Sequence, residues 1–147
     1  MAILEIFNLL HFVGLAFGVG GATVASIISA KAEKNQELSP AVMKIIPSIS
    51  RLIWLGLILL IISGIGLSYN AKWPINTKIL TIKHALVALI IIIGAVIGFK
   101  VKKMSNLAPK LKQVPSLQFI KTKNQLKVLS TINLILWYIV VILSVFI

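Results

Sequence analysis

Cysteine is absent from this chain of 147 residues, and only three residues are acidic. The missing thiols exclude disulfides, iron–sulfur clusters and thiolate metal sites. The N-terminus also lacks a basic segment, carries Glu5, and continues into an apolar stretch longer than the roughly 7–15 residues of a signal-peptide core. We therefore expect this first apolar stretch to be a helix of the protein and not a signal peptide.

Apolar residues are abundant in this chain, and charged residues are scarce. They make up 59% of the chain, and the mean hydropathy is +1.03. Soluble globular domains contain roughly 45–50% apolar residues, so too few polar groups remain here to cover a surface in water. The sequence therefore predicts a single integral membrane domain over residues 1–147, with lipid as its solvent.

Four apolar segments stand out along the chain. They cover residues 3–30, 52–69, 79–99 and 128–147. Each is close to the roughly 20 residues that a helix needs to cross a hydrocarbon core about 30 Å thick. A helix also satisfies its own backbone polar groups in lipid. We therefore predict an all-α fold, a bundle of four transmembrane helices in a multi-pass protein of the cell membrane.

The connections between these segments differ in charge. Basic residues are concentrated in two of them: Lys31, Lys34, Lys44 and Arg51 in residues 31–51, and Lys100, Lys102, Lys103, Lys110, Lys112, Lys121, Lys123 and Lys127 in residues 100–127. The connection between the second and third helices has only Lys72 and Lys78. The positive-inside rule then predicts both basic loops in the cytoplasm and both termini outside.

The net charge of +12 bears on the partners of the protein. The charges lie between apolar runs, which favours anionic lipid head groups as partners and argues against nucleic acid. Within the first loop, Ser39-Pro40 predicts the start of a short interfacial helix over residues 41–46 that Pro47 ends. Residues 107–125 mix lysines with apolar side chains, which suits either the membrane surface or a solvated basic loop.

Three ionisable side chains stand out within the predicted spans, His11, Lys83 and His84, with Glu5 near the outer end of the first. Such residues are costly in a membrane and are functional candidates by default. His11 lies ~12 Å below the outer end of the first helix and His84 roughly 8–12 Å into the third, at 1.5 Å per residue. Two imidazoles at matched depth on two helices can ligate a haem iron from opposite faces.

The residues around His11 allow more than one interpretation. Gly14 and Gly18 leave its helix face free of bulk, which makes room for a cofactor but also fits close packing of membrane helices. The histidines can accordingly ligate haem or a metal, form structural hydrogen bonds or relay protons. Lys83 can extend to the outer interface, pair with Glu5, bind a haem propionate or replace His84 as the iron ligand.

The fourth helix carries a polar stripe at helical spacing, formed by Ser130, Asn133, Trp137 and Ser144. We expect this stripe to face the interior of the bundle. Asn133 lies in the cytoplasmic half of the helix, away from the histidines. We therefore predict that it contributes an interhelical hydrogen bond, worth ~0.6–2 kcal/mol in membrane helices.

Short motifs in the first three segments resemble those of a known family, and the similarity to its four-helix pattern spans all four segments. Leu10-His11 followed by residues 18–21, Ser50-Arg51-Leu52 leading to residues 63–66, and Lys83 in the third helix are similar to the copper-resistance-D (CopD) membrane family. The HemJ-type protoporphyrinogen oxidases share this four-helix pattern. The resemblance of this chain to the HemJ-type group implies that it binds haem b through His11 and Lys83. The chain departs from the pattern in Gly18, where the family has Trp, and in His84, which adds a possible ligand.

These observations leave three functions open. The first is a haem-b membrane protein that transfers electrons or anchors a redox complex, with protoporphyrinogen oxidation as its family-based version. The second is copper transport or binding, although copper(I) prefers soft ligands and only His11 and His84 lie within the spans. The third is a non-catalytic accessory subunit of a larger membrane complex. We expect association with a second copy or with other membrane subunits.

Overall fold

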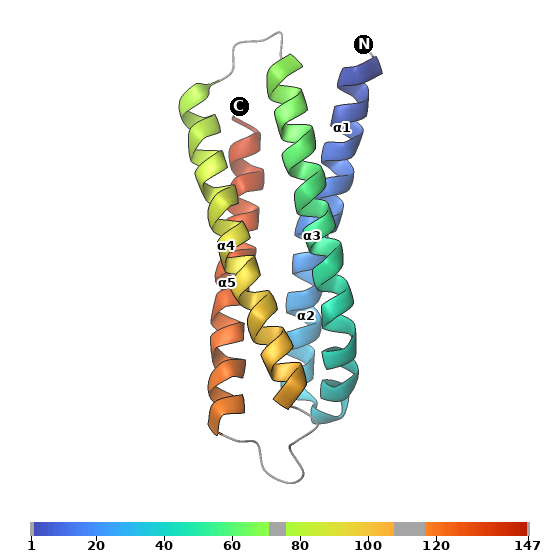
Figure 1. The fold of residues 1–147 in the computed structure, drawn as a ribbon, viewed down its shortest axis with the longest axis vertical. Helices are drawn as coiled ribbons and strands as arrows, with labels where there is room; N and C mark the ends of the chain where they lie inside the picture. The colour runs from blue at the N-terminus through green and yellow to red at the C-terminus, as the bar shows by residue number, and fades with distance from the viewer. Residues whose placement is uncertain (1, 71–75, 108–116, 147) are drawn as a thin grey trace. The chain divides into compact units, whose positions relative to one another are not determined.

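A computed structural model describes residues 2–70, 76–107 and 117–146. Within them the fold is all-α (Figure 1). Its elements are α1 (Ala2–Leu15), the π-helical turn η1 (Ala16–Gly20), α2 (Gly21–Lys34), the short 3-10 helix η2 (Gln36–Leu38), α3 (Ser39–Asn70), α4 (Thr77–Leu107) and α5 (Leu117–Ser144).

Within the described residues, four stretches of helix are long and apolar enough to cross a membrane. They are Ile3–Lys34, which joins α1, η1 and α2, together with Ser39–Asn70, Thr77–Met104 and Leu117–Ser144. The predictions of an all-α fold and of four long apolar helices are confirmed. Two predictions stay untested by the fold: that both termini lie outside, and that the membrane is the cell membrane.

The contacts within the chain group it into two compact units. Unit 1 is Met1–Leu80 together with Phe146–Ile147, and unit 2 is Thr81–Val145. In unit 1, α3 packs against α1, η1 and α2. Unit 2 contains α4 from Thr81 onward and the whole of α5. A hydrogen bond 2.7 Å long from Nζ of Lys100 to Oε1 of Gln125 joins these two helices.

The first predicted loop, residues 31–51, is largely helical, which corrects the prediction. Helix α2 continues to Lys34, and α3 already begins at Ser39. Pro47 does not end a short interfacial helix, because it lies inside α3. Proline removes one backbone donor and disturbs one turn, and long membrane helices tolerate that local loss. The helix therefore passes through Pro47 into the membrane-spanning part.

The second predicted loop, residues 100–127, is also shorter than expected. Helix α4 continues to Leu107 and α5 begins at Leu117, eleven residues before the apolar run that starts at Val128. Leucine, lysine and glutamine are good helix formers, so a helix persists there without an apolar sequence. Part of the surface segment predicted over residues 107–125, namely 108–116, lies outside the described residues.

Candidate functional site

One face of the first span meets α3 along a continuous line of contacts, which we call the seam. It pairs Phe7 with Gly66, His11 with Ser63, Gly14 with Leu60, Gly18 with Gly56, and Gly21 with Ile53. The numbers rise along the first span as they fall along α3, so the two helices are antiparallel. On the first span the spacing alternates between four and three residues, which is the period of left-handed coiled coils.

The glycines of the seam let two backbones meet. A Cβ atom added to Gly56 would overlap the backbone nitrogen of Gly18 and lie 2.8 Å from the carbonyl oxygen of Gly14. A Cβ added to Gly14 would lie 2.9 Å from Cγ of Leu60. The space beside Gly14 and Gly18 is thus filled by α3, which supports the packing interpretation of these glycines. Their assignment to a cofactor stays a prediction.

The first span widens where it passes Gly56. Residues Ala16–Gly20 form a π-helical turn, and Gly18 is buried within it. Such turns insert one residue into an α-helix and occur often near functional sites. The sequence signal for it is the cluster Gly18-Val19-Gly20-Gly21, which lacks bulk at the point of closest approach. The turn starts five residues after His11 and belongs to the same seam.

His11 makes a hydrogen bond across the seam. Its Nδ1 atom lies 2.9 Å from Oγ of Ser63, and the hydroxyl of Ser63 donates to the carbonyl oxygen of Leu60 at 3.2 Å. A hydroxyl has one proton. When Ser63 gives this proton to Leu60, its oxygen accepts from Nδ1–H of His11, which is one of the two tautomers that the contact allows. The imidazole lone pair then lies on Nε2, the arrangement found in histidines that ligate metals.

Ser63 is the residue of this site that the sequence analysis did not assign. Its side chain is fully buried, with an exposed fraction of 0%. It shares one face of α3 with Gly56 and Gly66, at distances of seven and three residues along the chain. This row of small residues was a signal for a packing face. Nothing in the sequence, however, indicated which residue of the first span lies opposite each member.

The two other predicted ligands belong to α4. Lys83 is half-buried and His84 is exposed. Both are in unit 2, whereas His11 is in unit 1, so their pairing with His11 stays a prediction. No group of three or more His, Cys, Asp or Glu side chains that could hold a metal ion occurs within residues 2–70, 76–107 and 117–146.

The polar stripe of α5 is partly buried, as predicted. Asn133 and Trp137 have exposed fractions of only 8% and 2%, and Ser130 and Ser144 are half-buried. Among the residues that the structure describes, Oδ1 of Asn133 and Nε1 of Trp137 have no hydrogen-bond partner. The interhelical hydrogen bond predicted for Asn133 is therefore not formed by its side-chain oxygen.

Four apolar helices of this length indicate a multi-pass integral membrane protein in contact with lipid. No protein-family model matches the chain, and no curated protein or solved structure matches it either. The CopD-like and HemJ-type resemblance therefore enters below only as a proposal.

Proposed function

We propose that the protein is an integral membrane haem-b-binding protein, in which Nε2 of His11 would hold the haem iron. The observation that carries this proposal is the hydrogen bond between Nδ1 of His11 and the fully buried Ser63. Histidines that ligate metals almost always donate their other ring N–H to a fixed acceptor, which sets the tautomer and the orientation of the ring. The oxygen of Ser63 is such an acceptor.

The residues have separate tasks in this proposal. Ser63 holds the proton on Nδ1, and the carbonyl oxygen of Leu60 fixes the hydroxyl of Ser63. The glycines of the seam hold α1 close enough to α3 for this bond to form. His84 and Lys83 are the proposed alternatives for the second ligand, Lys83 being the one that the HemJ-type resemblance implies.

Haem b, when bound, supplies one-electron chemistry. Electron transfer, alone or as the membrane anchor of a redox complex, follows most directly from such a centre. Protoporphyrinogen oxidation is a narrower version that rests on the family resemblance alone.

An absorption spectrum of the purified protein tests the proposal. We expect a Soret band in protein from haem-replete cells and its loss or shift in His11→Ala, because the variant lacks the ligand nitrogen. The variants His84→Ala and Lys83→Ala serve as a pair, since only the one that removes the second ligand should change the spectrum. A colourless wild-type preparation that takes up no haem on titration contradicts the proposal.

Ser63→Ala is expected to weaken haem binding without abolishing it. Removing the group that accepts the hydrogen bond of a ligating histidine typically lowers the affinity for the bound metal by about 10–100-fold, because the ring is no longer held in one tautomer and orientation. Titration of haem into the apoprotein measures this effect. Ser68→Ala, five residues further along α3, is the matched control. Equal affinities of Ser63→Ala and wild type would show that His11 does not act through Ser63.

A second candidate function is that of a non-catalytic accessory subunit. The same observation favours it, because a His–Ser bond inside a glycine-lined seam also serves as an interhelical fastening. This function predicts stable co-purification with other membrane chains, and tolerance of substitutions at His11 and His84. Copper binding remains a third proposal, which metal analysis of the purified protein separates from the other two.

A further inference from the structure

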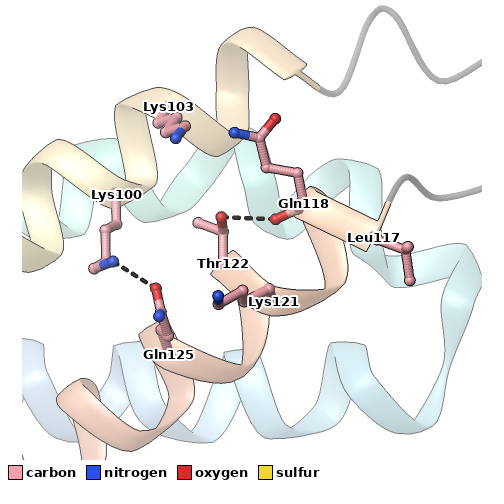
Figure 2. Close-up of a pocket in the computed structure, with 7 residues that line it drawn as sticks. All are labelled: Lys100, Lys103, Leu117, Gln118, Lys121, Thr122 and Gln125. Atoms are coloured by element: carbon pink, nitrogen blue, oxygen red, sulfur yellow. Dashed lines mark hydrogen bonds between the residues drawn. The ribbon is translucent and has the colours of Figure 1, made fainter.

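A pocket of about 400 Å³ lies within unit 2, between the end of α4 and the start of α5. Its lining residues are Lys100, Lys103, Leu117, Gln118, Lys121, Thr122 and Gln125. Figure 2 shows that the three lysines come from both helices, with Lys100 reaching from α4 to Gln125 of α5. Three lysine side chains from two helices thus line one pocket.

Hydrogen-bond donors outnumber acceptors among the side chains that line the pocket. Oε1 of Gln125 accepts a hydrogen bond from Lys100, so the amide of Gln125 has its NH₂ group left to offer. The hydroxyl of Thr122 donates to the carbonyl oxygen of Gln118 at 2.8 Å. The lining contains no carboxylate. A ligand that accepts several hydrogen bonds and carries negative charge fits this set of groups.

The counter-charge cannot come from either helix. The last acidic residue of the sequence is Glu37, so α4, α5 and the connection between them contain no Asp or Glu. Neighbouring like charges raise one another's energy unless an anion lies between them. An anion from outside this half of the chain would lower the repulsion among the lysines of the pocket.

The position of the pocket along the helices indicates which kind of anion it binds. The apolar run of α4 ends at Phe99 and that of α5 begins at Val128, so the lining residues start where the hydrocarbon ends. Both helices continue for two or more turns beyond these points. The polar layer of a bilayer, roughly 5–7 Å on each side of the hydrocarbon core, lies at this level.

We propose that this pocket binds the head group of an anionic phospholipid. Basic pockets between membrane helices bind phosphorylated head groups through lysine ammonium groups, and this pocket adds amide donors. Its volume lies in the range of sites for molecules of many atoms, which favours a lipid head group over a free phosphate ion. The pocket belongs to the end of the protein that the basic loops place in the cytoplasm. The proposal does not depend on haem.

Native mass spectrometry of the delipidated full chain in a neutral detergent tests this proposal. The detergent removes the bilayer surface potential, so lipid retained at one copy per chain reports a site. Phosphatidylglycerol, phosphatidylcholine and inorganic phosphate are added separately, and phosphate also competes against phosphatidylglycerol. The pocket variant K100Q/K103Q/K121Q is compared with K102Q/K123Q/K127Q, which removes three lysines from the same helices outside the pocket.

We expect wild type to retain one phosphatidylglycerol and to discriminate against phosphatidylcholine. The pocket variant should bind phosphatidylglycerol at least about tenfold more weakly, since losing one charged hydrogen bond already has that effect. The control variant should change by less than about twofold. Equal weakening in both variants, equal retention of phosphatidylcholine, or displacement of the lipid by an equal concentration of phosphate would each overturn the proposal.

Discussion

Gly56→Ala is expected to lower the free energy of unfolding of the protein by roughly 3 kcal/mol or more, at the upper end of the cost of overpacking. The new Cβ atom would meet backbone atoms of Gly18, Gly14 and Phe17, including the carbonyl carbon of Phe17 at 2.9 Å. Backbone atoms cannot rotate away as a side chain can. The first span and α3 must therefore separate along the seam, which also lengthens the bond between His11 and Ser63. Thermal unfolding in detergent, followed by circular dichroism, measures the loss.

Gly64→Ala provides the matched control on the same helix. A Cβ at Gly64 meets nothing within 4 Å among the described residues of the chain. Alanine is favoured over glycine inside a helix by roughly 0.5–1 kcal/mol. This variant should therefore unfold at or slightly above the wild-type temperature. If Gly56→Ala and Gly64→Ala unfold at the same temperature, the seam does not hold the two helices together.

The fold could be predicted from the sequence to the extent that it depends on hydrophobicity. Apolar runs of about 20 residues identify the membrane-crossing part of each helix, because lipid requires both an apolar surface and a satisfied backbone. The ends of the helices escaped this reasoning. The turns of α5 between Leu117 and Lys127 are rich in lysine and glutamine, so hydropathy does not mark them, although helix propensity does.

The site was predictable on one helix but not between helices. The spacing of His11, Gly14 and Gly18 placed them on one face, as the seam confirms for their helix. Which face of the next helix lies opposite depends on the register between the two helices, and the sequence contains no direct record of it. Ser63 and the lysine pocket were missed for this reason. Each exists only once two helices are aligned.

Asn133→Leu is expected to raise the free energy of unfolding by about 1–3 kcal/mol, the cost of a buried polar group without a partner. Asn133 is 8% exposed, and its Oδ1 atom has no hydrogen-bond partner among the residues that the structure describes. Leucine branches at the same carbon as asparagine, so it occupies similar space without the orphaned oxygen. The measurement is again thermal unfolding in detergent.

Two further variants separate the possible reasons for the effect. Asn124→Leu changes the same residue type at an exposed position of α5 and should alter stability by no more than about 0.5 kcal/mol. Trp137→Phe removes the neighbouring indole N–H, which also has no partner in the described part of the chain, but it leaves a cavity because Trp137 is only 2% exposed, so we expect it to lower stability by about 1 kcal/mol. Loss of stability in Asn133→Leu would instead mean that the side chain of Asn133 binds a polar molecule in the membrane. The stability of Asn133→Leu relative to Asn124→Leu thus distinguishes a tolerated unpaired oxygen from a binding position on α5.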